Sequence, residues 1–397
     1  MKLRSGIALT TYFVLILFVT APLPAILISI ILVTLSEKKK YLDVRVAALL
    51  LSLFLGSINA TKLPESDLLN FYGWLSLAQD FSLTQYIVLF GKEPLYFLWI
   101  YLIGNFPGIN GPLFALISTA VVYFAFFLGL ISLGRAVQWP EGRVLVVIVF
   151  ISVFSPLFNA SAHLMREFMA GAAVSLYFVR GILGYRSNLW VLFLAALIHS
   201  TAAVFIPFAL ISRIKNLPQW AIFALVAVFY LSLYILAQTA TTYLVQIPLI
   251  GYVFGRFVET TRDVYVLGPA PILFAAASGF GALFINNIVR LRITPTYRPI
   301  SSPAVREFSA SVILLSVFII VLYLRGDSMY PIRFLLYLYF LIGILLFFLQ
   351  AIPIIRFITT AMSYSILPVL FFYNLAYGIW SYASLDHILF YPFIFNF

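Results

Sequence analysis

The stretch LFALISTAVVYFAFFLGLISL, residues Leu113–Leu133, decides the fold class, because it contains no charged residue and can cross a bilayer as one helix. A transmembrane helix needs about 20 consecutive apolar residues. Similar stretches recur along the 397-residue chain, of which 63% is hydrophobic and only 9% is charged. No soluble fold can hide that much apolar surface from water, so the sequence predicts a protein that lies within a bilayer.

Short polar loops separate the other apolar stretches. These are Ile7–Leu35, Val44–Ala60, Val144–Phe158, Glu167–Leu183, Leu189–Ile211, Gln219–Thr239, Ala270–Val289, Ser309–Leu324, Phe334–Phe348 and Phe357–Asn374. The prediction is an all-α polytopic membrane protein with about 10–12 transmembrane or re-entrant helices. No long polar stretch interrupts them, so residues 1–397 are expected to form a single integral membrane domain. The first stretch is interpreted as a retained span that Pro22 and Pro24 kink or break.

The balance of charge indicates an orientation rather than a nucleic-acid partner. The chain has 24 Lys and Arg against 13 Asp and Glu, and the basic residues gather in loops at helix ends. Cytoplasmic loops of membrane proteins are basic, so we assign these loops to the cytoplasm. The opposite, outer face is nearly neutral and carries most of the acids, in segments at about residues 61–112, 240–269 and 325–333. The chain has no cysteine, which excludes disulfides, thiolate metal sites and a Cys nucleophile.

The segment Leu189–Ile211 presents a problem of parity, because Arg186 precedes it and Arg213 follows it. One crossing cannot place both flanks in the cytoplasm. One solution is a broken, re-entrant hairpin with His199 near its tip. Irregular backbone at membrane depth must be buried in protein or line a wet cavity, so this hairpin would place His199 in a cavity. The alternative is an ordinary span with one basic flank outside.

The first outer segment contains two short apolar stretches. Ser66 and Asp67 resemble a helix start, and Phe71 and Trp74 follow at helical spacing, which predicts a helix in the membrane interface with aromatic anchors. Pro94–Phe106 is apolar but too short to cross, so we expect a half-inserted helix there.

Several motifs follow one another in order along the chain. They are Asp67 with Tyr72, then EPLYF at Glu93–Phe97, MREFMAGA at Met165–Ala172, LAALIHSTA at Leu194–Ala202 and YPIRF at Tyr330–Phe334. This ordered set resembles the EpsG/Wzy-type family of bacterial polysaccharide polymerases, which make O-antigen and exopolysaccharide. The chain departs from the family pattern at Leu63–Ser66, where a run containing arginine is usual, and at Glu167, where a polar amide is usual.

The resemblance implies a function and a location. Members of the family act on undecaprenyl-diphosphate-linked oligosaccharides, as donor and as acceptor, at the outer face of the bacterial inner membrane. They move the growing glycan onto the non-reducing end of a lipid-linked repeat unit, and they resemble GT-C glycosyltransferases in architecture. Membrane lipid surrounds them and co-polymerases that regulate chain length are usual partners, whereas neither a nucleic acid nor a cofactor is expected.

Arginine side chains are the candidates for binding the diphosphate, because the planar guanidinium binds phosphate oxygens in a bidentate manner and stays charged. Arg166 is the first candidate, since the small residues after it permit close approach of helices. Arg333 is the second, and Arg325 and Arg256 follow. The alternative roles are a snorkelling or Glu167-paired arginine for Arg166, an interfacial anchor for Arg333, and an exposed surface pair with Asp327 for Arg325.

An attacking sugar hydroxyl also needs a base, and three residues are candidates. Asp67 and Glu93 compete for this role, although Asp67 is also a plausible helix N-cap and Glu93 a first-turn carboxylate. His199 lies among apolar residues, where an ionisable group is a functional hypothesis and a structural histidine is the alternative. Tyr72 and Tyr330 are candidates to stack on sugar, or members of an interfacial aromatic belt. No metal motif is visible, so we expect chemistry without a metal.

Two other functions share these features. A ligase that moves finished O-antigen-type glycan to an acceptor would use the same arginines and lipid diphosphate, but it usually has a longer outer domain. A flippase for lipid-linked oligosaccharide should place charge along a central path. The charges here gather at one outer level, which favours catalysis over transport.

Overall fold

The computed structural model describes residues 2–35, 42–61, 67–90, 93–185, 189–212, 269–290, 302–324 and 329–351, with the single residues 221, 228 and 357. Across these ranges the regular elements are all helical and there is no strand. The elements are α1 (Lys2–Thr20), α2 (Pro22–Leu35), α3 (Val44–Ala60), α4 (Asp67–Leu77), α5 (Leu83–Phe90), α6 (Pro94–Gly104), α7 (Gly111–Ala136), α8 (Glu141–Ser152), α9 (Ser155–His163), α10 (Met165–Ile182), α11 (Trp190–Ile198), the 3-10 helix η1 (Ser200–Val204), α12 (Phe205–Ser212), α15 (Ala270–Arg290), α16 (Ser302–Leu324) and α17 (Met329–Ala351).

Several helices in the described ranges have the length and composition of membrane spans. They are Gly111–Ala136 in α7, Ala270–Asn287 in α15, Pro303–Leu324 in α16 and Pro331–Leu349 in α17. The pair α8 and α9, bent by 58°, makes a fifth span if it is counted as one. The predicted class, an all-α polytopic membrane protein, is confirmed. Apart from the single residues 221, 228 and 357, the predicted spans Gln219–Thr239 and Phe357–Asn374 lie outside the described residues, so the total of about 10–12 helices stays a prediction.

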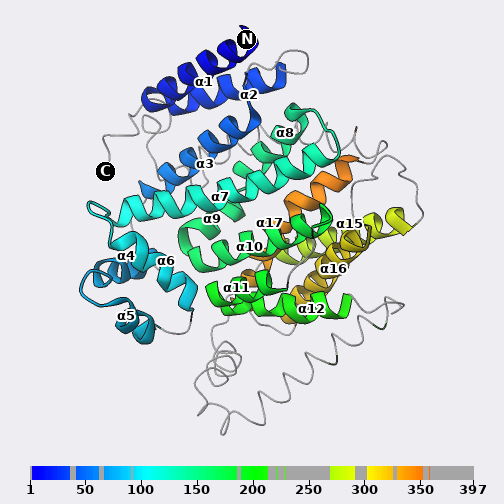
Figure 1. Ribbon diagram of the computed structural model, residues 1–397. Helices are drawn as coiled ribbons and strands as arrows, with labels where there is room; N and C mark the ends of the chain where they lie inside the picture. The colour runs from blue at the N-terminus through cyan, green and yellow to red at the C-terminus, as the bar shows by residue number, and fades with distance from the viewer. Residues whose placement is uncertain are drawn as a thin grey trace.

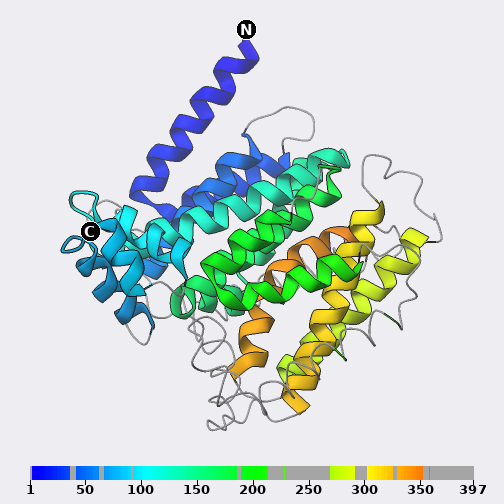
Figure 2. The same cartoon turned by 60° about the horizontal axis from the view of Figure 1, so that its bottom comes forward.

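Helix α7 lies at the centre of one part of the bundle. This helix lies between α3 and α10, and α17 packs against α10 (Figure 1). The helices α15, α16 and α17 form a group of their own, and α4, α5 and α6 gather at the amino-terminal end of α7. Figure 2 shows α1 projecting away from the other helices. The bundle therefore has a short-helix region, α4–α6, beside the start of its central helix.

Two of the predicted single spans are broken. Ile7–Leu35 forms α1 and α2, which separate at Ala21, directly before Pro22, so the predicted proline break is confirmed. Val144–Phe158 is not one continuous helix, because α8 ends at Ser152 and α9 begins at Ser155, so this span is a bent pair of helices if it crosses the membrane once. Pro156 occupies the first turn of α9, where its missing N–H needs no partner, but inside a continuous helix it would remove a hydrogen bond.

The segment Leu189–Ile211 is broken at the predicted place. Helix α11 ends at Ile198, His199 has extended backbone (φ −151°, ψ 127°), and η1 begins at Ser200. The predicted break at His199 is therefore confirmed, while the return of the chain to the same side of the membrane stays a prediction.

Aromatic rings hold α10 against α7 and α17. The ring of Phe168 lies 5.0 Å from that of Tyr123 on α7 and 5.2 Å from that of Phe340 on α17. A Cβ on Gly171 would lie 2.5 Å from the Phe340 ring, so this position accepts no side chain without a shift. The predicted close approach at the small residues of α10 is confirmed. The same packing fixes the start of α10 relative to the start of α17.

A second aromatic group fixes α6. The ring centroid of Phe71 on α4 lies 5.4 Å from that of Tyr96 on α6, and the centroid of Trp74 on α4 lies 5.1 Å from that of Phe97 on α6. The hydroxyl of Tyr86 on α5 donates to the carbonyl of Trp74 at 2.7 Å. Helix α4 begins at Asp67, as the sequence predicted, and α6 has 11 residues, too few to cross a bilayer. These contacts hold the residue before α6, Glu93, in a fixed place.

The closest backbone approach between α3 and α7 gives a test of this packing. A Cβ on Gly56 would lie 2.6 Å from the carbonyl oxygen of Leu116, which cannot move without shifting α7. We expect Gly56→Ala to destabilise the protein by roughly 1–3 kcal/mol, the usual range for overpacking, measured as a lower apparent melting temperature in detergent.

The matched control is Gly73→Ala on α4, where a Cβ would meet nothing within 4 Å. Because alanine is the better helix former, we expect this control to leave the melting temperature unchanged or raise it. Equal losses in the two variants would contradict the proposed tight contact between α3 and α7.

Candidate active site

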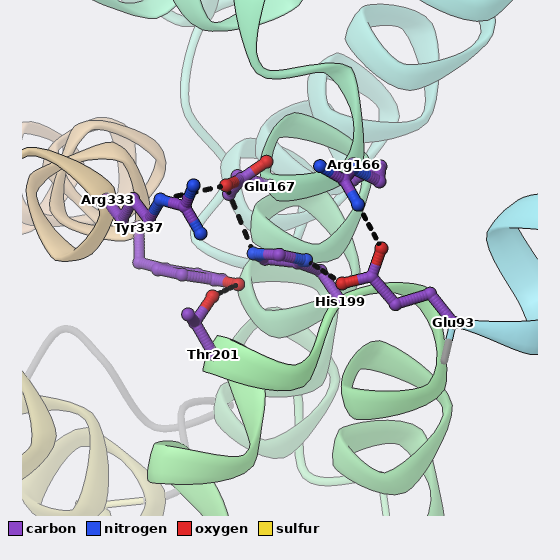
Figure 3. Close-up of polar contacts among 7 residues, drawn as sticks. All are labelled: Glu93, Arg166, Glu167, His199, Thr201, Arg333 and Tyr337. Carbon is purple, nitrogen blue, oxygen red and sulfur yellow. Dashed lines mark hydrogen bonds and ion pairs between the residues drawn. The ribbon is translucent and has the colours of Figure 1, made fainter. Parts of the chain in front are cut away.

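Five ionisable side chains from four separate parts of the chain form one network of alternating charge (Figure 3). Its members, in spatial order, are Arg166, Glu93, His199, Glu167 and Arg333. Isolated charges are costly to bury, so a buried group of this kind is stable only when each charge has an opposite neighbour. We call this group the charge network.

The first half of the charge network joins α6 to α10. Arg166 Nη1 donates to Glu93 Oε2 at 2.7 Å. Glu93 directly precedes α6 and therefore stands beside the positive end of that helix, which favours a carboxylate. The guanidinium of Arg166 also lies over the ring of Trp74, 5.9 Å from its centroid. Arg166 is thus held by α4 and by the residue before α6.

The second half joins α10 to α11 and α17. His199 bonds through Nδ1 to Glu93 Oε1, while its Nε2 lies 3.0 Å from Glu167 Oε1. The same Glu167 oxygen is 3.6 Å from Nε of Arg333. Arg166 and Glu167 are consecutive residues in the first turn of α10, so they point in different directions and reach different partners.

Burial divides the network into two kinds of residue. The side chains of Glu93, Glu167 and His199 are 1%, 0% and 2% exposed, whereas those of Arg166 and Arg333 are 17% and 21% exposed. The two arginines are therefore the members that a molecule outside the protein can reach. The acids and the histidine lie behind them.

The acid that pairs with Arg166 is ionised. Glu93 precedes α6 and lies outside the spanning helices. Burial by itself would raise its pKa, but the hydrogen bond and charge of His199, together with the charge of Arg166, lower the pKa of Glu93 below its ordinary value. A fixed negative charge therefore faces the guanidinium.

A neutral hydrogen bond supports the histidine. The hydroxyls of Thr201 in η1 and Tyr337 on α17 lie 2.8 Å apart, and both residues adjoin the charge network. Tyr337 follows Arg333 by one helical turn, so the two share a face of α17. This bond ties the segment after His199 to the helix that carries Arg333.

Four of the residues proposed from sequence meet in this network: Glu93, Arg166, His199 and Arg333. Their individual roles stay predictions. Arg166 pairs with Glu93, and Glu167 pairs with His199 and Arg333, instead of the Arg166–Glu167 pair considered as an alternative.

The other proposed residues stand apart or lie outside the description. Asp67 begins α4, but its side chain is not among those described, and the same holds for Tyr330 in α17. Arg256 and Arg325 lie outside the described residues. The ring of Tyr72 packs against Gly111, where a Cβ would lie 2.4 Å away, and burial raises the pKa of Tyr72 to about 12. Its hydroxyl is therefore a neutral donor at physiological pH.

Sequence reasoning missed three residues of the site. Glu167 was visible as a departure from the family pattern, and that exchange of an amide for an acid was its signal. Thr201 followed His199 within a quoted motif, and Tyr337 stood one turn after Arg333, but nothing in the sequence paired these two hydroxyls across 136 positions.

The acids and the histidine do not form a metal site within the part of the chain that the structure describes. No group of three or more His, Asp or Glu side chains there could hold a metal ion. The reason is visible in Figure 3, since Glu93 and Glu167 lie on opposite sides of the His199 ring and do not converge on one point.

These features define a membrane protein with a buried, arginine-bearing charge network near the ends of its helices. A family model described as the EpsG family matches residues 45–395, most of the chain, and the chain therefore belongs to the EpsG family. EpsG is a family of Wzy-type polymerases of bacterial membranes, so the protein is a polysaccharide polymerase that acts on lipid-linked saccharides. No curated protein and no solved structure matches the chain.

The central acid of the network provides a stability test. Glu167→Ala would leave Arg333 and His199 without their shared carboxylate in a fully buried place. Removing one partner of a buried pair costs roughly 3–5 kcal/mol, so we expect a large fall in the apparent melting temperature of the purified protein.

Glu141→Ala is the matched control. Glu141 pairs with Arg135 at 3.5 Å, where the two side chains are 21% and 38% exposed, and exposed pairs of this kind contribute about 0–1 kcal/mol. If Glu141→Ala lowered the melting temperature as much as Glu167→Ala, the charge network would have no special part in stability.

Proposed function

We propose that this polymerase is a GT-C-like glycosyltransferase that uses undecaprenyl-diphosphate-linked glycan as donor. It transfers the growing glycan onto the non-reducing end of a lipid-linked repeat unit, at the outer face of the bacterial inner membrane. One observation carries the proposal: two partly exposed arginines are held in place by buried acids. A donor that leaves as a diphosphate needs fixed positive charge where its negative charge develops.

The arrangement suits a diphosphate for two reasons. Guanidinium groups bind phosphate oxygens through paired N–H donors, and they remain charged at any physiological pH. Each arginine already lies beside a carboxylate, which fixes its direction before substrate arrives. Donors that need no reorganisation at the moment of reaction stabilise a transition state more than flexible ones do.

The reaction breaks one bond and forms one. The bond between the sugar anomeric carbon and the diphosphate oxygen breaks, and its electron pair leaves with undecaprenyl diphosphate, whose charge Arg166 and Arg333 stabilise. The acceptor hydroxyl oxygen bonds to the same carbon, and its proton passes to a carboxylate base. Glu93 already bonds to His199 and Arg166 through its two oxygens, which favours Asp67 over Glu93 as this base.

The direct test of the reaction is a comparison of glycans from cells with and without the gene. We expect the deletion to abolish the ladder of surface polysaccharide and to leave single repeat units, because elongation stops after one unit. Full-length chains that remain on the carrier lipid would instead indicate a ligase. Repeat units trapped at the cytoplasmic face would indicate a flippase.

Arginine-to-lysine exchanges test the diphosphate site. Arg166→Lys and Arg333→Lys keep the charge but lose the planar fork, so we expect each to lower the polymerisation rate by about 10²–10³-fold, the usual effect of removing one oriented donor. The rate is measured with lipid-linked repeat units extracted from the deletion strain.

The control for this test is Arg180→Lys. Arg180 lies at the other end of α10, the helix that carries Arg166; it is exposed, and its guanidinium lies over the ring of Tyr185, 5.9 Å from the ring centroid. We expect wild-type rates from this variant. Wild-type rates from both Arg166→Lys and Arg333→Lys would refute the assignment of the two arginines to the diphosphate.

A further inference from the structure

The histidine at the centre of the charge network has a carboxylate at each ring nitrogen. Glu93 bonds to Nδ1 and Glu167 lies 3.0 Å from Nε2. A neutral imidazole has one N–H and one lone pair, so one of its two nitrogens would direct a lone pair at an ionised oxygen. Only the imidazolium form carries an N–H at both nitrogens, so it alone places positive charge beside both carboxylates and leaves no lone pair facing one. The two short contacts therefore favour the doubly protonated ring.

Neighbouring segments fix the backbone at His199. His199 N donates to the carbonyl of Ala195 at 2.9 Å, which ends α11, and Ala202 N donates to the carbonyl of His199 at 3.0 Å. Thr201 is bonded to Tyr337. The backbone that carries the ring is therefore fixed relative to α11, η1 and α17, and the ring itself is held by its contacts with Glu93 and Glu167.

The surrounding charges agree with a protonated ring. The charged or titratable groups beside His199 are Glu93, Glu167 and, beyond them, Arg166, Arg333 and the neutral Tyr337. With a neutral ring, two carboxylates would face each other across an uncharged spacer inside the protein. With an imidazolium ring, the charges alternate along the whole network, and its three positive and two negative members suit an incoming dianion.

We propose that His199 is a doubly protonated positioning residue, not a base, and that it sets the separation of the two arginines. It bonds to Glu93 through Nδ1 and pairs with the charge of Glu167 through Nε2, and each carboxylate lies beside one guanidinium of the diphosphate site. This inference rests on the proposed function for the identity of the ligand, but the protonation of the ring does not depend on that function.

The protonation state is measured on the wild-type protein by nitrogen NMR. The chain has three histidines, so labelling with ¹⁵N-histidine gives few signals, and His199→Gln identifies the one from His199. The same exchange at His163 removes a different signal and serves as control. At pH about 7.5, where an ordinary histidine is mostly neutral, we expect both ring nitrogens of His199 to carry hydrogen. A ring with one protonated nitrogen would overturn the proposal.

The positioning role is measured by binding of farnesyl diphosphate, a short polyprenyl diphosphate, to the full-length protein in detergent. His199→Gln cannot donate to both carboxylates from opposite sides, so the arginines lose their fixed separation and we expect binding weakened by about 10-fold or more. His199→Lys keeps a cation that can donate to both acids, so it should recover much of the affinity. A base would affect rate and not binding, so wild-type affinity in His199→Gln would overturn the positioning role.

Failure of this inference and failure of the proposed function give different results. If the wild-type protein does not bind farnesyl diphosphate and the gene deletion leaves the glycan ladder intact, the proposed function fails, whatever the NMR spectra show. If Arg166→Lys abolishes the ladder but the His199 ring is neutral, the function stands and the positioning role is refuted.

Discussion

The pairing of charges in the interior is the constraint on which the arrangement of this protein depends. Glu93, Glu167 and His199 are almost completely buried in a chain whose other interior residues are mostly apolar. Charges in such a place are tolerated only in mutual contact, because removal from water costs several kcal/mol for each ion. The residue before α6, the first turn of α10, the break after α11 and the first turns of α17 must therefore meet at one point.

The apolar packing of the bundle brings the helices that carry these charges together. Phe168 and Gly171 place α10 against Phe340 of α17, and both helices carry an arginine of the network near their amino-terminal ends. The aromatic contacts of Trp74 with Phe97 hold the start of α6. Rings and small residues thus decide where the helices cross, and the ion pairs decide which ends come together.

The sequence predicted what depends on local composition and on order. The run of apolar residues at Leu113–Leu133 predicted a span, Pro22 predicted a break, and the two basic flanks of Leu189–Ile211 led to the break at His199. Four of the residues proposed for the site meet there. The pairing itself could not be predicted, because nothing local joins Glu93 to His199 across 106 positions. The bend between α8 and α9 was missed because the apolar composition of Val144–Phe158 resembles that of a straight span.

The ion pairs of the network bear on the choice between catalysis and transport. A transporter for a lipid-linked glycan must expose its site alternately to the two sides, which requires the helices around the site to move past one another. Here four segments are tied through consecutive ion pairs, and Thr201 and Tyr337 add a further bond between two of them. Moving any one segment would separate buried charges. An enzyme gains from the same rigidity, because fixed donors stabilise a developing charge without reorganisation. The charge network is therefore better suited to the proposed transfer reaction than to transport.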